Sequence, residues 1–110
     1  MKLPYKEFAC VPRSKLKDYL LSETHIVGRS KAKLLRMLGF NEANLDSLEQ
    51  GLITIAQTQE VSEIIPSQHG KKYTIDGLLY TPINKSIKVR TVWIIDKGQD
   101  KPRFVTAYPN

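Results

Sequence analysis

The chain has 110 residues, of which 41% are hydrophobic and 25% charged, a composition that excludes wholesale disorder and is sufficient for one hydrophobic core but not for two. No apolar run approaches the roughly 20 residues that cross a bilayer, and the first residues lack the apolar core of a signal peptide. Cys10 is the single cysteine, which excludes an internal disulfide. We therefore expect one domain spanning residues 1–110, located in the cytoplasm and without a membrane partner.

Charge is distributed unevenly along the chain. There are 17 Lys and Arg residues against 11 Asp and Glu, for a net charge of +6. Residues 41–70 contain five acidic side chains and no Lys or Arg, whereas the segments on either side are basic. A fold that joins the two basic segments would present a positive face to a phosphate backbone or to an acidic protein. A solvated surface of a basic protein is an equally compatible interpretation.

The first half of the chain is predicted to be helical. Residues 1–13 contain two prolines and are expected to form an extended lead-in. The apolar spacing that follows predicts three helices, over residues 15–21, 29–38 and 42–57. Ser14 and Asn41 are the expected N-caps of the first and third helix, and Gly39 ends the second. Tyr19 falls on the apolar side of the first helix.

The second half has the pattern of β-strands. The predicted strands are residues 60–66, 72–80, 86–96 and 102–108. Within the second strand, Asp76 and Gly77 predict a bulge or a kink. In the preceding helix, Gly51 lowers the helix propensity. Short connections imply an antiparallel meander. The expected fold is α+β, with two to three N-terminal helices (14–58) packed on a four-stranded antiparallel sheet (60–109).

Alternation along the strands predicts which side chains share a face. Arg90 lies on one face of the third strand and Trp93 on the other. On the last strand, regular alternation places Thr106 and Tyr108 on the same face as Phe104. The Thr and Tyr hydroxyls are able to orient a phosphate there, and they are equally able to close a core.

Motif spacing excludes several classes of enzyme. There is no phosphate-binding glycine loop, no dinucleotide fingerprint and no Cys/His metal spacing, so we expect neither a metal nor a cofactor. His25 precedes the second helix, and Lys31 falls in the first turn of that helix. Together they could hold a phosphate, with His25 as acid or base. His25 could equally be a connector residue that hydrogen-bonds the helix start. We interpret His69 either as an exposed turn residue or as a second acid–base group.

The chain contains three distinctive motifs, HxxGxxKA over residues 25–32, RTVW over residues 90–93 and TAYP over residues 106–109. With these motifs it resembles a widespread family of small bacterial proteins of unknown function, whose members look like toxin components or toxin domains. The resemblance extends from about Leu16 to Pro109. The order of elements is also similar to that of the barnase, EndoU, tRNase colicin and RelE-like toxin superfamily.

The resemblance implies the toxin of a toxin–antitoxin pair, acting as a metal-independent endoribonuclease that uses the 2′-OH of RNA as nucleophile. The implied catalytic residues are His25, Lys31, Arg90, Thr106 and Tyr108. Further RNA contacts are expected from Arg29, Lys71, Lys72 and Lys88. The expected partners are RNA (tRNA, mRNA or rRNA) and a small acidic antitoxin, with no DNA. Two alternatives remain, namely a non-enzymatic module that binds RNA or an acidic protein, and a structural partner in an operon complex.

Overall fold

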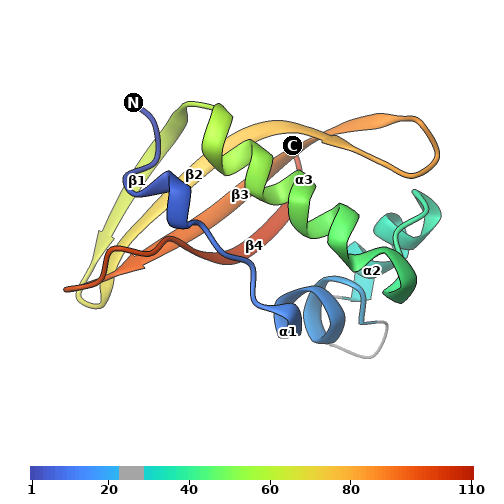
Figure 1. Ribbon diagram of the computed structural model, residues 1–110, viewed down its shortest axis with the longest axis horizontal. Helices are drawn as coiled ribbons and strands as arrows, with labels where there is room; N and C mark the ends of the chain where they lie inside the picture. The colour runs from blue at the N-terminus through green and yellow to red at the C-terminus, as the bar shows by residue number, and fades with distance from the viewer. Residues whose placement is uncertain (23–28) are drawn as a thin grey trace.

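Helices occupy the first half of the chain and an antiparallel sheet the second (Figure 1). The computed structural model describes residues 1–22 and 29–110. Its helical elements are η1 (Lys6–Phe8), α1 (Arg13–Lys15), the π-helical turn η2 (Leu16–Leu20), α2 (Arg29–Met37), η3 (Glu42–Asn44) and α3 (Leu45–Thr58). Its strands, in sheet order, are β1 (Val61–Ser67), β2 (Gly70–Tyr80), β3 (Ser86–Asp96) and β4 (Arg103–Pro109). The predicted α+β fold class is confirmed.

The helices of the first half begin and end close to their predicted positions. Ser14 is not the N-cap of the first helix, because Pro12 takes that place and the helix already includes Ser14. Pro12 has no N–H to satisfy at this position, and its carbonyl accepts a hydrogen bond from the Lys15 backbone N–H at 2.9 Å. Asn41 caps η3 by accepting a hydrogen bond from the Ala43 backbone at 2.8 Å. Gly39, with a φ of 97°, ends α2 as predicted.

The lead-in is part of the folded structure rather than a simple extended arm. It contains the short helix η1, and Leu3 and Val11 are buried in the core. Cys10 forms a parallel bridge with Arg103 at the start of β4. Residues 1–13 therefore pack against the sheet because their apolar side chains complete its core.

Two glycines set the distance between α3 and the sheet. The bulge, one of the two alternatives predicted at Asp76 and Gly77, is wrong, because β2 and β3 stay in register through both residues. A Cβ atom on Gly77 would lie 2.9 Å from the Ile55 side chain of α3. A Cβ atom on Gly51 would lie 2.6 Å from the Leu79 side chain of β2. These glycines permit close helix–sheet approach, which compensates for the weaker local propensity of both elements.

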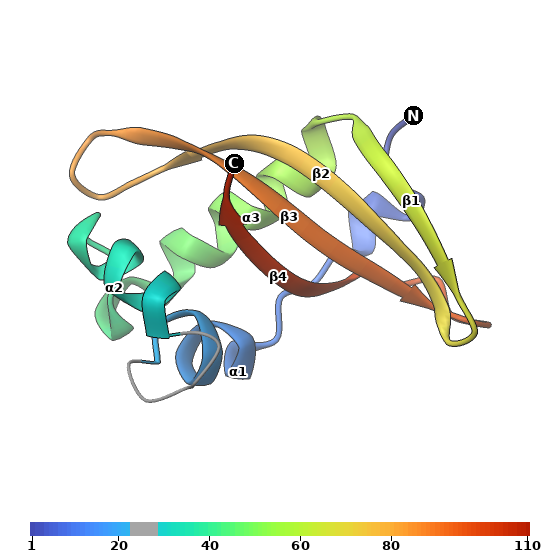
Figure 2. The same cartoon turned by 180° about the vertical axis from the view of Figure 1, so that it is seen from behind.

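The sheet has one face packed against α3 and one over which the described residues place no helix, which we call the open face (Figures 1 and 2). The packed face carries the buried Trp93, which meets Phe104 edge to face with ring centroids 5.4 Å apart. The short elements α1 and α2 lie beside β4 instead (Figure 2). Among the described residues, no helix is long and apolar enough to span a membrane.

A bulge in β4 overturns the predicted pattern of faces on this strand. Trp93 pairs with Phe104, but Val92 pairs with Thr106, so β4 holds one extra residue at this point. Thr106 therefore lies on the side opposite Phe104. Tyr108 pairs with Arg90 and lies on the same open face as Thr106. The predicted grouping of Thr106 and Tyr108 with Phe104 is wrong because regular alternation does not allow for a bulge.

Thr91 links the buried indole to the sheet, and its removal should destabilise the fold. Its hydroxyl donates to the Ile75 carbonyl at 2.7 Å and accepts from Trp93 Nε1 at 2.8 Å. Thr91→Val leaves the buried indole N–H without an acceptor, so the free energy of unfolding should fall by about 2 kcal/mol. Urea denaturation measures this change. The control Thr54→Val, at an exposed site on α3, should stay within about 0.5 kcal/mol of the parent. Equal stability of the two variants would contradict this role.

Candidate functional site

A lysine and two hydroxyl groups from three separate elements meet beside β4. Lys31 Nζ of α2 donates hydrogen bonds to Tyr19 Oη of η2 and to Thr106 Oγ1 of β4, each at 2.8 Å. The two hydroxyl oxygens are themselves 3.0 Å apart. Lys31 Nζ also lies 5.7 Å from the ring centroid of Tyr108. We call these four residues the Lys31 cluster, which brings together positions up to 89 residues apart in the chain.

The cluster holds a cation without neutralising it. Among the residues that the structure describes, no carboxylate forms an ion pair with Lys31, whose polar partners are the Tyr19 and Thr106 hydroxyls. Hydroxyl oxygens accept hydrogen bonds but carry no formal charge. Lys31 and Tyr108 also border a pocket whose other lining side chains are apolar. Because apolar surroundings screen charge less than water does, the ammonium exerts a strong local field.

The two nearby cations alter the acidity of Tyr19. Partial burial alone would raise the pKa of the phenol from its ordinary value of 10.0, but hydrogen bonds with Lys31 and Thr106 act in the opposite direction. The positive charges of Lys31 and Lys15 add to this effect, so that the net change lowers the pKa of Tyr19. The Lys15 ammonium lies 5.2 Å from the centroid of the Tyr19 ring. Tyr19 is therefore a better proton donor than an isolated tyrosine.

Arg90 continues the site along the open face. It is the register partner of Tyr108, and it pairs with Asp76 through Nε to Oδ1 at 2.8 Å and Nη2 to Oδ2 at 2.9 Å. The hydrogen bonds from Arg90 lower the pKa of Asp76, and those to Asp76 raise the pKa of Arg90. The two hydrogen bonds to Asp76 occupy two of the five N–H groups of the Arg90 guanidinium. Arg90 is thus well fixed beside the Lys31 cluster, with its charge largely matched.

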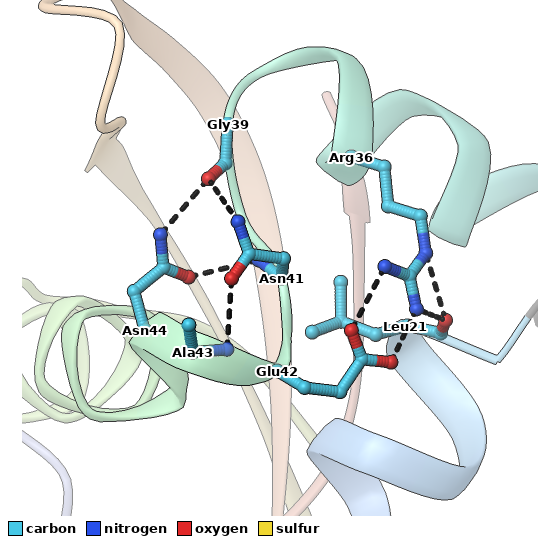
Figure 3. Close-up of polar contacts among 7 residues, drawn as sticks. All are labelled: Leu21, Arg36, Gly39, Asn41, Glu42, Ala43 and Asn44. Atoms are coloured by element: carbon cyan, nitrogen blue, oxygen red, sulfur yellow. Dashed lines mark hydrogen bonds and ion pairs between the residues drawn. The ribbon is translucent and has the colours of Figure 1, made fainter.

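An arginine clasp fixes the end of η2 against α2 (Figure 3). Arg36 Nε and Nη2 donate to the Leu21 carbonyl at 3.2 and 2.6 Å, and Nη1 and Nη2 bind the Glu42 carboxylate at 3.0 and 2.6 Å. The hydrogen bonds from Arg36 lower the pKa of Glu42 to about 2. Because Leu21 directly follows η2, the clasp ties the end of the element that carries Tyr19 to α2, the helix that carries Lys31.

The structure brings together most of the predicted catalytic residues. Lys31, Thr106 and Tyr108 form one cluster, and Arg90 lies next to Tyr108. His25 lies outside the described residues, so its predicted role stays a prediction. Tyr19 was not among the predicted site residues, because its spacing with neighbouring leucines indicated a core position.

The second histidine lies far from this cluster. His69 is in the β1–β2 turn, and Asp76, the partner of Arg90, lies six positions along β2 from the strand start at Gly70. At about 3.3 Å per residue this corresponds to about 20 Å. His69 is therefore remote from Arg90 along the sheet, and its suggested role as a second acid–base group stays a prediction.

The predicted RNA contacts fall on different parts of the surface. Lys88 lies on the open face two residues from Arg90, and Lys72 shares that face through its pairing with Ile94. Lys71 is the next residue along β2 and therefore points to the opposite side of the sheet. The side chain of Arg29 lies outside the described part of the structure. Lys72 and Lys88 are thus the two predicted contacts placed on the same face as Arg90.

The position of Lys31 predicts a measurable change in the titration of Tyr19. Lys31→Met removes the hydrogen bond and the positive charge that favour the phenolate, so the pKa of Tyr19 should rise. Lys33→Met, at an exposed position of the same helix, should leave it nearly unchanged. NMR of carbon-13-labelled tyrosine rings measures the titration, and Tyr19→Phe assigns the signal. The same Tyr19 pKa in the parent and in Lys31→Met would show that the ammonium does not act on this phenol.

Comparison with known proteins concerns the fold and the family. A comparison with curated proteins gave no match to the sequence. Among solved structures, the fold is similar to a chain of the "Contact-dependent growth inhibition toxin - immunity protein complex from Klebsiella pneumoniae 342". The TM-score is 0.76 at 17% identity, covering 96% of this chain and 97% of that chain. A family model described as "Domain of unknown function (DUF6883)" matches residues 2–110, and the chain therefore belongs to the DUF6883 family.

Proposed function

We propose that the protein is a toxin that cleaves RNA without a metal ion, at the Lys31 cluster. The observation that carries this proposal is the Lys31 ammonium, which two neutral hydroxyls hold at 2.8 Å and which no carboxylate neutralises among the described residues. A fixed cation of this kind stabilises a phosphate and, more strongly, the phosphorane that forms from it. Thr106 and Tyr108, which share a face of β4, would orient the phosphate.

The chemistry that this site would support uses a nucleophile already present in the substrate. A base takes the proton of the ribose 2′-OH, and the 2′-oxygen attacks the adjacent phosphorus. The bond to the 5′-oxygen breaks, an acid protonates that oxygen, and a 2′,3′-cyclic phosphate remains. His25 is the predicted base or acid, and Lys31 with Arg90 would offset the charge of the phosphorane.

The net charge and the structural neighbour support the toxin role and a protein partner. The neighbouring structure contains a toxin and an immunity protein. A net charge of +6 favours the toxin of such a pair, because a ribonuclease must attract a polyanion. A small acidic protein, acting as antitoxin or immunity protein, would then block the protein by covering Lys31 and the open-face cations Lys72 and Lys88.

Paired lysine variants test the proposal. The purified protein is incubated with total RNA and with tRNA in EDTA, and the ends of the fragments are analysed. The parent should produce discrete fragments with 2′,3′-cyclic phosphate ends. Lys31→Met should cut at least about 100-fold more slowly, as expected when one charge-stabilising donor is lost. Lys33→Met removes the same charge from the exposed side of α2 and should cut at the parent rate.

Two outcomes would contradict the proposed function. If Lys31→Met remained as active as Lys33→Met while both were folded, the cluster would not be the active site. If the parent failed to cleave any RNA but bound it with an affinity that fell steeply with salt, the non-enzymatic binding module would be the better account. In that case, removal of Lys72 and Lys88 together should flatten the salt dependence.

A further inference from the structure

Tyr19 presents its hydroxyl at the centre of the cluster. Tyr19 Oη accepts a hydrogen bond from Lys31 Nζ at 2.8 Å and shares a second with Thr106 Oγ1 at 3.0 Å. The side chain is partly buried, and the clasp made by Arg36 fixes the end of the element that carries it. A hydroxyl held in this way is aligned before a substrate arrives, which is a requirement for efficient proton transfer.

We propose that Tyr19 is the general acid that protonates the 5′-oxygen leaving group, an inference that rests on the proposed cleavage of RNA. As the 2′-oxygen bonds to phosphorus, the phosphorus–5′-oxygen bond breaks and its electron pair stays on the 5′-oxygen. The proton of Tyr19 Oη passes to that oxygen and completes the 5′-OH product. The base of the proposed reaction holds the proton of the 2′-OH, and exchange with water restores both groups.

The other members of the cluster are less suited to this step. If Lys31 gave up its proton, the site would lose its cation at the moment when charge on the phosphorane is greatest. The hydroxyl of Thr106 is aliphatic and therefore a much weaker acid than a phenol. The structure places the ring of Tyr108, rather than its hydroxyl, against Lys31 Nζ. Tyr19, by contrast, becomes a tyrosinate whose negative charge lies 2.8 Å from the Lys31 ammonium. The lowered pKa of Tyr19 agrees with this arrangement.

A substrate with a sulfur leaving group distinguishes general-acid catalysis by Tyr19 from the other roles that this residue could have. The test uses an oligoribonucleotide that contains the mapped cleavage site, and a copy in which sulfur replaces the bridging 5′-oxygen. A thiolate leaves without protonation, so it needs no general acid. Tyr19→Phe should cut the oxygen substrate about 100-fold more slowly than the parent does. The same variant should cut the sulfur substrate at nearly the parent rate. Tyr5→Phe, at an exposed tyrosine, should match the parent on both.

The outcomes separate failure of this inference from failure of the proposed function. An equal loss of rate on both substrates would overturn the acid role and show that Tyr19 orients other groups. A parent protein that cleaves neither substrate would overturn the cleavage of RNA itself.

Replacing Tyr19 with 3-fluorotyrosine gives a second test of the acid role, with almost no change in the shape of the side chain. Because fluorine lowers the pKa of the phenol, the alkaline decline of the rate should move to lower pH. An unmoved decline would overturn the proposal.

Discussion

The hydrogen bonds of the Lys31 ammonium are the interaction on which the candidate site depends. They join η2, α2 and β4 through two hydroxyls that the chain brings together from positions 19 and 106. A carboxylate in place of either hydroxyl would hold the lysine more strongly, but it would also cancel its charge. Hydroxyl partners hold the ammonium in one place without cancelling its charge. Arg90, by contrast, is paired with the Asp76 carboxylate on the same face, which largely matches its charge.

Local irregularities of the fold produce this geometry. The bulge in β4 turns Thr106 away from the face of Phe104, and without it the hydroxyl would point toward the core. The clasp made by Arg36 and Glu42 sets the end of η2 against α2 and so places Tyr19 within reach of Lys31. Gly77 lets α3 lie close to β2 on the packed face of the sheet. The bulge and the clasp together bring Thr106 and Tyr19 to Lys31.

Much of the fold could be predicted from the sequence because hydrophobic periodicity is a local signal. The strand from Ser86 to Asp96 was predicted with its observed bounds, since its β-branched residues alternate regularly. The site was predicted less well. A bulge depends on pairing between strands, so regular alternation assigned Thr106 to the wrong face. Tyr19 has the spacing of a core residue, and only the tertiary contact with Lys31 distinguishes it. His69 was considered as an acid–base group because distance along a sheet cannot be read from residue type.

The most direct test of the Lys31 cluster is a structure of the protein bound to RNA that carries a 2′-O-methyl group at the mapped cleavage site. The methyl group removes the nucleophile, so the complex should remain intact. The account predicts that an oxygen of the scissile phosphate lies about 3 Å from Lys31 Nζ, with the leaving 5′-oxygen toward Tyr19. RNA bound elsewhere, with Lys31 in contact only with Tyr19 and Thr106, would contradict it.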